Sequence, residues 1–473
     1  MRDCSWLLRI EDGRCTLVAG DRVESGERFF AEGAWAGPFT ADGLLGSGFV
    51  CGSGAVYDGA TVHVVGPSHS VEPVYAFLGA GRALVSNSLH AIVAACPEAA
   101  PPDLKSARVH AASATAGLHG YERSLYDTAA GEMRRYLFSG FSIDVGDLAV
   151  RERPRPSLDA ELGSFADYRG ALAGTLSALR ENAAAPQRRH PFDRVVTTCS
   201  SGYDSPVCAV LAQEIGAVQA LTISSGRGGA KDSGRPVAEA LGLECLEFER
   251  VGSGLEKQGR LTLPEGLRGL ALLKYLVRAS VKYVAVRLRL WPSDRGLSFL
   301  DAAHVPATGY EDFLATVNTP EDLFFAPFEP HLRGAIVLTG FHGDKAWHPG
   351  CPSGPEIKRG DNSGSGLDEF RKRVGFVNVP VPFIGIEQNE QIARVGASAE
   401  MAPYTLGNDY DRPIARRIAE EAGVPREVFG REKSAGSVLL VKAEARRRAA
   451  FDALVAEYRT AVADRPTLVL SEG

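Results

Sequence analysis

From about residue 190 onward, short apolar segments rich in β-branched residues alternate with segments of helical spacing. Strands that alternate with helices in this way form parallel sheets with helices on both faces. This half of the chain is therefore predicted to be an α/β domain. The predicted strands are Arg194–Thr198, Val218–Ile223, Leu243–Phe248 and Ala335–Leu338, and the predicted helices are Leu162–Glu181, Pro206–Ile215, Val237–Leu241, Arg412–Ala422 and Val438–Ala463.

The first 150 residues show a different pattern. Short apolar runs such as Thr61–Val65, Ala83–Ser86 and Phe138–Ile143 are separated by Gly, Ser and Asp turns, which indicates a β-rich region. Arg151–Ser157 contains two prolines among charged residues and reads as an exposed linker. We therefore divide the 473 residues into a domain of residues 1–155 and a domain of residues 160–473.

The composition sets limits on the partners. Apolar residues make up 45% and the net charge is −6, so nucleic acid and anionic membranes are not expected. The basic run Arg446–Arg448 is interpreted as a solvated helix face. The eight cysteines show no zinc spacing and fit reduced, buried thiols. No apolar run is long enough to span a membrane and no leader peptide is evident, so we expect a cytoplasmic protein, and a homodimer stays open.

The junction between the predicted strand Arg194–Thr198 and the following helix has the form of an anion site. The residues there are Ser200-Ser201-Gly202-Tyr203-Asp204-Ser205. A tight turn into a helix directs backbone N–H groups and the helix dipole at one spot, and Gly202 allows close approach of a phosphate. Asp204 fits such a site when Mg²⁺ bridges it to phosphate oxygens. The plain alternative is a serine-capped helix.

Other glycine-rich segments match phosphate motifs less well. Gly226–Lys231 resembles a P-loop, but Ala230 stands where the glycine before the lysine is needed. Gly46, Gly48 and Gly52 have the wrong spacing for a dinucleotide fingerprint and are expected in hairpin turns. Gly350–Gly366 is rich in Gly, Ser, Pro and charge, and is predicted to be a mobile loop.

Ser200–Ser205 resembles the Ser-Gly-Gly-x-Asp-Ser loop of the ATP pyrophosphatases, with Ser201 in place of the first glycine. Three further segments follow in the order found in asparagine synthetases and β-lactam synthetases. Leu221–Ser224 is similar to the strand end whose backbone receives adenine, and the stretch from Asp232 is similar to the one after it. Leu338–Asp344 resembles the second glycine-rich loop, and Arg431-Glu432-Lys433 resembles the Arg-x-Lys near the domain's end. The resemblance covers residues of about 190 to 440.

The N-terminal half also resembles this family's Ntn-type glutaminase domain, through Leu84–Leu89 and Leu125–Asp127. Such glutaminases need a cysteine directly after the initiator Met, whereas Arg2 stands there and the nearest thiol is Cys4. We therefore expect a degenerate scaffold domain without glutaminase activity, as in β-lactam synthetases and lasso-peptide cyclases. An unrelated β-rich domain stays open.

The resemblance implies an ATP-dependent, AMP-forming ligase with Mg²⁺ as cofactor. Asp204 and Asp344 would hold Mg²⁺, and Lys433 would stabilise negative charge on the reacting phosphate and acyl groups. The substrates would be a small carboxylic acid and an amine, or one molecule that carries both. The residues expected to bind the nucleotide are Ser200, Ser201, Gly202, Asp204, Ser205, Ser224 and Gly343.

The second half-reaction departs from both subfamilies. Phe341 stands where β-lactam synthetases have a catalytic Tyr, and Lys345 follows Asp344 where asparagine synthetases usually have Glu. His342 is a candidate base, although a structural role is equally compatible. Glu400 is off by a residue from the partner Glu and receives no role, and Trp347 and His348 are candidates for the acceptor pocket. These departures favour an unfamiliar amine, or one that arrives deprotonated.

Three rival functions stay open. The first is an ammonia- or glutamine-dependent amidotransferase of the asparagine synthetase type, which a mature chain starting at Cys4 would favour. The second is a non-catalytic nucleotide-binding or scaffold protein, because Ser201, Phe341 and Lys345 alter motif positions. The third is a tRNA-modifying pyrophosphatase, which lacks support because the chain has no Cys pair for sulfur transfer and no basic surplus.

Overall fold

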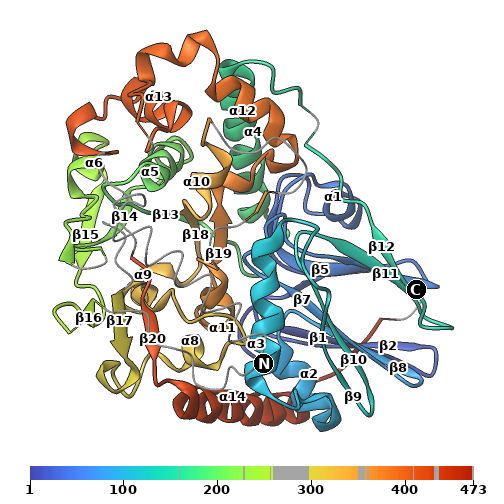
Figure 1. Cartoon of the computed structure of the whole chain (residues 1–473). Helices are drawn as coiled ribbons and strands as arrows, with labels where there is room; N and C mark the ends of the chain where they lie inside the picture. Colours follow the sequence, from blue (N-terminus) through green and yellow to red (C-terminus); the bar gives the residue numbers. More distant parts are fainter. Residues whose placement is uncertain are drawn as a thin grey trace.

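The chain is a mixed α/β protein with antiparallel sheets in its N-terminal part and a parallel sheet in its C-terminal part (Figure 1). The coordinates are a computed structural model. The residues that the structure describes are 1–158, 160–226, 229–255, 257–258, 298–349, 357–358, 362–408, 410–430 and 436–470.

The N-terminal part contains two antiparallel sheets that pack face to face. The first has seven strands, in the order β21 (Leu468–Val469), β2 (Arg14–Ala19), β1 (Trp6–Glu11), β8 (Arg82–Ser86), β7 (Val74–Gly79), β10 (Gly131–Tyr136) and β9 (Ser124–Thr128). The second has six strands, in the order β12 (Val150–Arg153), β11 (Gly140–Asp144), β6 (Thr61–Val65), β5 (Val50–Tyr57), β4 (Phe29–Trp35) and β3 (Glu24–Ser25).

The two-residue period of the strands explains this layering. In β1, Trp6, Leu8 and Ile10 point between the sheets, where they join buried residues of both. Leu7 points to the opposite face, which the helices α2 (Leu89–Ala95) and α14 (Glu444–Asp464) cover. The short helix α1 (Ala41–Gly46) and the long helix α4 (Phe165–Ala183) pack on the outer face of the second sheet. The sandwich is therefore covered by helices on both sides (Figure 1).

The C-terminal end of the chain returns to the N-terminal part. Helix α14 packs against α2 and α8 (Glu311–Ala315), and β21 pairs with β2 at the edge of the first sheet. The apolar side chains Phe451, Leu454 and Tyr458 bring α14 into the core beneath that sheet. The boundary at residues 155–160 stays a prediction, and the final segment ties the two parts together.

The parallel sheet is built as the alternation of elements predicts. Its order is β15 (Glu244–Phe248), β14 (Gln219–Ile223), β13 (Arg194–Thr198), β18 (Ala335–Thr339) and β19 (Val377–Pro380), and all four pairings are parallel. Neighbouring residues of β13 face opposite sides: Val195 packs toward α5 (Asp204–Glu214) and α13 (Pro413–Glu421), and Val196 packs toward α9 (Glu329–Leu332) and α11 (Asp368–Val374). The predicted strands of this half are thus confirmed to within a residue or two.

Some sequence-based predictions are wrong at their edges. Val438–Ala463 is not one helix, because Leu439–Val441 forms β20 and pairs with β17 (Ser298–Asp301), and Lys442 adopts a left-handed φ of 54° before the helix. The strand predicted from Phe138 begins at Gly140, since Phe138 has a φ of 52°. The exposed linker begins later than predicted, because its first three residues extend β12.

Two predictions about particular residues are also corrected. Gly46 ends α1 and Gly52 lies inside β5, facing Gly33 of β4, so these glycines are not hairpin turns. The run Arg446–Arg448 is a solvated face only at Arg448, which is exposed and pairs with Asp452. Arg447 is buried and donates to the carbonyls of Leu314, Thr316 and Asn318, and Arg446 donates to those of Ala302, Val305 and Pro306. These guanidinium groups bind backbone carbonyls that lie more than a hundred positions earlier in the chain, which helical periodicity cannot reveal.

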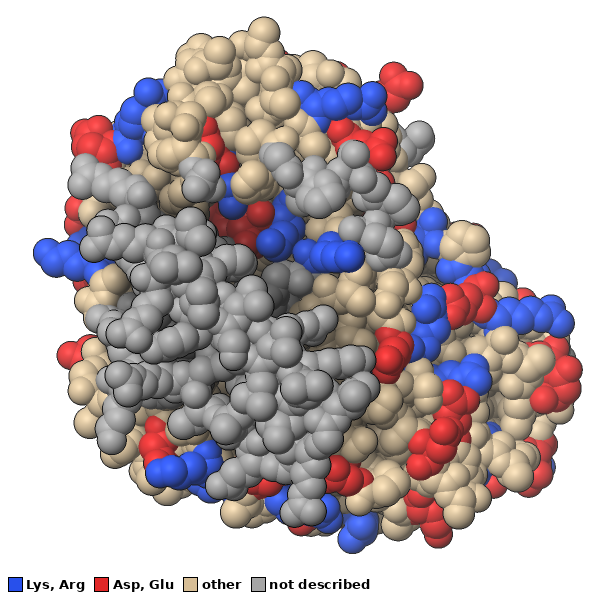
Figure 2. Space-filling view, in the orientation of Figure 1, with Lys and Arg blue, Asp and Glu red and all other residues tan. Residues whose placement is uncertain are grey.

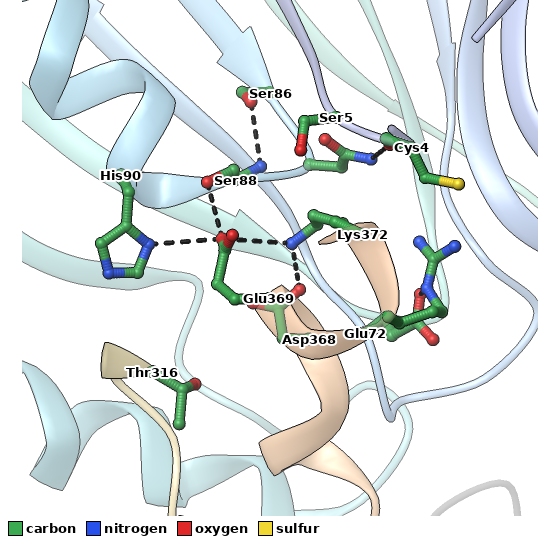
Figure 3. A network of polar contacts seen from close by, with 12 residues as sticks. Cys4, Ser5, Glu72, Ser86, Ser88, His90, Thr316, Asp368, Glu369 and Lys372 are labelled. Atoms are coloured by element: carbon green, nitrogen blue, oxygen red, sulfur yellow. Dashed lines mark hydrogen bonds and ion pairs between the residues drawn. The ribbon is translucent and has the colours of Figure 1, made fainter. Parts of the chain in front are cut away.

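Helix α11 carries a buried network of charges to the boundary between the two parts (Figure 3). The carboxylate of Glu369 accepts hydrogen bonds from Ser88 Oγ at 2.6 Å and from Tyr458 Oη at 2.9 Å, and contacts His90 Nδ1 at 3.3 Å. Lys372 pairs with Asp368 and Glu369. The partners come from α2, α11 and α14, so the network fixes these elements relative to one another.

Most of the cysteines are buried free thiols, as the sequence predicts. Cys4, Cys15, Cys51, Cys96, Cys199 and Cys208 are buried free thiols, Cys245 is half-buried, and Cys351 lies outside the described residues. Lys and Arg side chains are interspersed with Asp and Glu over the face shown in Figure 2. No helix within the described ranges has the length and apolar character that crossing a membrane requires.

Candidate functional site

The order of the parallel sheet creates a crevice at the end of β13. The chain proceeds from β13 to β14 on one side, and later enters β18 on the other side of β13. Connections that leave a strand in opposite directions open a crevice at the carboxyl ends of parallel strands, where ligands bind in open α/β sheets. The loop Ser200–Ser205 leaves β13 at this point, and the loop Gly340–Gly343 leaves β18 beside it.

Hydrogen bonds of its own serines, and hydrogen bonds to Asp232, fix the shape of the first loop. Ser200 Oγ lies 2.8 Å from Ser205 Oγ and accepts the N–H of Gly202 at 3.2 Å. Ser201 Oγ donates to Asp232 Oδ1 at 3.0 Å, and its N–H donates to the carbonyl of Asp232 at 3.3 Å. Helix α5 begins directly after, at Asp204, without a side-chain hydrogen bond from its N-cap residue Tyr203. The predicted strand–loop–helix junction is confirmed, and its N-terminal helix turn faces the crevice.

The second loop packs directly on Asp204. A methyl group built on Gly343 would lie 2.5 Å from both Cγ and Oδ1 of Asp204. A methyl group on Gly340 would lie 2.8 Å from the Asp204 carbonyl carbon. Both contacts are shorter than carbon atoms tolerate, so glycine at these positions allows the two loops to touch. Asp344 follows Gly343 in the first turn of α10 (Gly343–Ala346), which brings the two carboxylates to the same crevice.

One cavity of about 250 Å³ occupies the crevice. Its polar end is formed by the two loops, and its apolar walls come from β14, from the turn η5 (Leu323–Phe328) and from Gly436 and Ser437. The predicted nucleotide- and metal-binding residues that line it are Ser200, Gly202, Asp204, Ser205 and Asp344, and the candidate base His342 also lines it. These six residues proposed from the sequence are thus brought together by the fold.

The donor set fits a magnesium ion shared with a phosphate ligand. Asp204 and Asp344 supply two carboxylates to one cavity, and among the described residues no group of three or more His, Cys, Asp or Glu is placed to hold a metal. Mg²⁺ commonly uses one or two carboxylates together with substrate phosphates and water, instead of a cage of protein ligands. Asp344 also lies 3.8 Å from Lys345 Nζ, and both side chains are partly exposed.

Asp232 is a third carboxylate at the polar end, and it is not among the site residues predicted from the sequence. Burial raises its pKa to about 6, although the hydrogen bonds from Ser201 act in the opposite direction. Its side chain accepts the hydrogen bond from Ser201 Oγ, and the positive charge of Arg250 also acts to lower its pKa. Asp232 therefore serves to hold the first loop in shape, and it adds negative charge to the cavity.

Three residues predicted to bind the nucleotide do not line the cavity. Ser224 does not line the cavity, and its N–H already donates to the carbonyl of Phe248 at 2.9 Å. Ser201 is turned toward Asp232, and Gly343 is buried beneath Asp204. On the β14 side the cavity is lined by Leu221 and Ile223 instead. The β14 end therefore offers apolar side chains to a ligand.

Lys433 and Arg431 lie outside the described residues. The chain on both sides of them is described, however. Gly430 donates its N–H to the Ser201 carbonyl at 2.8 Å, and Gly436 and Ser437 line the cavity. The described residues on both sides of residues 431–435 therefore lie at the site. Of the predicted mobile loop Gly350–Gly366, the structure describes residues 357–358 and 362–366, and Ser365 and Gly366 are buried in the turn η6 (Ser365–Leu367).

The residues considered for the second half-reaction have diverse surroundings. His342 is buried with a left-handed φ of 66°, and its Nε2 lies 3.1 Å from the carbonyl of Ser363. A carbonyl only accepts, so Nε2 carries the hydrogen. Trp347 is a core residue that donates to Tyr168 Oη at 2.8 Å, and Glu400 caps the start of α4 by accepting the Phe165 N–H. Neither Trp347 nor Glu400 lines the cavity.

Several lining residues were not found from the sequence. Asp322 and the aromatic residues of η5 belong to no recognised motif, although the run Leu323-Phe-Phe-Ala-Pro-Phe328 is an unusual concentration of aromatic side chains. Tyr410 approaches the first loop, with its Oη 3.4 Å from a methyl group built on Gly202. This aromatic run, which lies shortly before a predicted strand, is the sequence feature from which the apolar wall of the cavity could have been predicted.

Replacing Gly343 tests the contact between the two loops. Gly343→Ala would force its methyl group into Asp204, so we expect a loss of stability of about 1–3 kcal/mol. Gly170→Ala is the matched control, because a methyl group there meets nothing within 4 Å and Ala favours the helix α4. Thermal unfolding should show a lower Tm for Gly343→Ala and an equal or higher Tm for Gly170→Ala. Equal Tm values for both variants would contradict the packed loops.

No protein-family model matches the chain, and a search of curated proteins gives no match.

Proposed function

We propose that the chain is an ATP-dependent, AMP-forming C–N ligase that adenylates a carboxylic acid and passes the acyl group to an amine. In this proposal the parallel-sheet part is an ATP-pyrophosphatase domain, and the sandwich is a degenerate Ntn-type glutaminase domain that serves as a scaffold. One observation carries the proposal: the loops after β13 and β18 touch, and each contributes a carboxylate to the same cavity.

The arrangement supports binding of the triphosphate between the two loops. The described charged side chains that line the cavity are acidic, namely Asp204, Asp232, Asp322 and Asp344. A polyanion would be repelled there without a cation, so Mg²⁺ held by Asp204 and Asp344 fits the proposal. When bound, Mg²⁺ would neutralise charge on the phosphate oxygens. The first turn of α5, which begins at Asp204, would present backbone N–H groups to the same oxygens.

The reaction then has two steps. An oxygen of the substrate carboxylate attacks the α-phosphorus of ATP, and pyrophosphate leaves with the electrons of the broken P–O bond. The amine nitrogen then attacks the acyl carbon, loses a proton, and AMP leaves. Lys433 is proposed to stabilise the charge that develops in both steps. Phe341 accepts no proton, so the proposal fits an amine that arrives deprotonated.

Pyrophosphate release tests the proposal directly. The purified chain is incubated with ATP, Mg²⁺ and a pool of carboxylic acids, and acid-dependent release of pyrophosphate and AMP is expected. Lys433→Ala should bind ATP as the unchanged chain does, measured by calorimetry, and lose at least about a hundredfold in turnover. If no acid stimulates release and ATP does not bind, the ligase proposal fails and a scaffold role replaces it.

A further inference from the structure

The apolar lining of the cavity extends from the β14 side to the β18 side. The β14 end is narrow: a methyl group built on Gly436 would lie 2.8 Å from Ile223 Cδ1 and 3.5 Å from the Phe324 ring. The other end lies beside β18, where Phe341 belongs to the second loop. Because β14 and β18 flank β13, a nucleotide whose base enters the β14 slot leaves the β18 end to the second substrate.

The β18 end is walled by aromatic rings. Phe341 stacks on Phe325 with ring centroids 6.0 Å apart and an interplanar angle of 30°. Phe325 in turn contacts Phe328 at 5.4 Å and Phe324 at 4.9 Å. Phe325 and Phe328 are buried, whereas Phe341 is half-buried and forms part of the cavity surface. The rings support one another, so the wall is fixed in shape.

The polar groups at this end are committed to the protein. The two oxygens of Asp322 accept the N–H groups of Gly364 and Gly366, each at 2.9 Å. His342 Nε2 faces the carbonyl of Ser363. Gly364 is tightly enclosed, since a methyl group there would lie 3.0 Å from the Phe341 ring. These contacts hold the segment of Ser363–Gly366 against the aromatic wall.

The charges at the cavity discriminate between substrate acids. Four carboxylates line it, and none of the described lining residues is a Lys or Arg. The reacting carboxylate would lie at the cation between the two loops. A second carboxylate on the substrate would lack a described partner and meet Asp322, which disfavours dicarboxylates. An apolar group would instead be buried against Phe341 and Phe325.

We infer that the acid adenylated by this chain carries an aromatic or branched apolar group, and that Phe341 and Phe325 select it over amino dicarboxylates such as aspartate. This inference rests on the proposed ligase function and names the substrate class of that same site. Phe341 acts as a specificity-determining residue, and it takes no part in proton transfer.

Acid-dependent ATP–pyrophosphate exchange tests the inference. The probes are phenylpropionate, benzoate and isovalerate, compared with aspartate, glutamate and acetate at equal concentration. We expect the apolar acids to drive exchange with a kcat/KM at least about tenfold above that of the dicarboxylates. Phe341→Ala should raise the KM for the apolar acid about tenfold or more and leave the KM for ATP unchanged, and Phe341→Leu should recover most of the loss.

A matched control and the opposing outcomes make the test decisive. Phe39→Ala removes a half-buried ring that stacks on Trp35 in the N-terminal part, and it should leave both KM values unchanged. Exchange driven best by aspartate or glutamate, or an acid preference unaltered in Phe341→Ala, overturns the inference and leaves the ligase proposal standing. Absence of exchange with every acid, together with absence of ATP binding, overturns both.

Discussion

Asp204→Asn and Asp344→Asn should each reduce acid-dependent pyrophosphate release by at least about a thousandfold. The two carboxylates come from different loops and line one cavity, and Gly343 beside Asp344 lies directly on the Asp204 carboxyl group. Each amide keeps the size of the side chain and removes its charge, so the loss would report the cation and not the packing. Steady-state release of pyrophosphate at saturating ATP measures the effect, with Mg²⁺ titrated at each step.

The control for this pair is Asp452→Asn, which changes an exposed carboxylate on α14 that pairs with Arg448. It should release pyrophosphate at the unchanged rate. The unfolding temperature of all three variants should stay close to that of the parent chain. Normal activity of Asp344→Asn would show that the two loops do not share a metal, and it would refute the pairing on which the proposed function rests.

Arg371→Met should destabilise the chain by about 3–5 kcal/mol. The Arg371 guanidinium is buried and pairs with Glu32 of β4 through two contacts, at 2.8 and 3.0 Å, and its Nε lies 2.7 Å from Glu72. Removing this cation leaves two carboxylates facing each other without water, although both segments stay packed. Equilibrium unfolding in denaturant measures the loss.

Arg333→Met is the matched control, because Arg333 also pairs with a carboxylate of the N-terminal part, Asp3 at 2.9 Å, but is 59% exposed. Its loss should be within about 1 kcal/mol. A loss of that small size for Arg371→Met would contradict the buried network.

The stability of Arg371→Met should depend on pH in one direction. In the unchanged chain, burial raises the pKa of Glu72 to about 7, above its ordinary value. A carboxyl group whose pKa is raised on folding takes up a proton in the folded state, so its stabilising effect is lost as pH rises through the raised value. Without Arg371 the pKa would rise further. Lowering the pH from about 8 to about 6 should therefore restore part of the lost stability.

Much of the second half of the fold could be predicted because its signals are local. The sequence predicts the strand Arg194–Thr198 with both ends correct, and it predicts both ends of the following helix to within two residues. Short β-branched runs between helices indicate buried parallel strands, because burial on both faces of the sheet requires apolar residues throughout the strand. The apolar run Val438–Val441 directly precedes a helical segment, so the sequence predicts it as the start of that helix. Its last three residues instead pair with β17 and form the strand β20.

The polar end of the site was predictable for a similar reason. A loop such as Ser200–Ser205 combines Gly, Ser and Asp at adjacent positions, and their chemistry can be read without knowing the neighbours. Ser224 shows the limit of such reasoning, because its N–H is used by β15 in the sheet. The aromatic wall of η5 was missed, since Phe324, Phe325 and Phe328 have no meaning for function until β18 is placed beside them.

The sequence by itself determined the alternation of strands and helices around β13, β14, β15 and β18, and the loop Ser200–Ser205 that follows β13. Both follow from local backbone preference and from periodic burial, which act over a few residues. Only the tertiary structure decided that Asp204 touches Gly343, that Phe341 and Phe325 form one wall, and that Arg371 neutralises Glu32. The first and third contacts join residues more than a hundred positions apart, and the second joins residues on either side of α9 and β18. Their energy depends on distance and burial, which the linear order of residues does not contain.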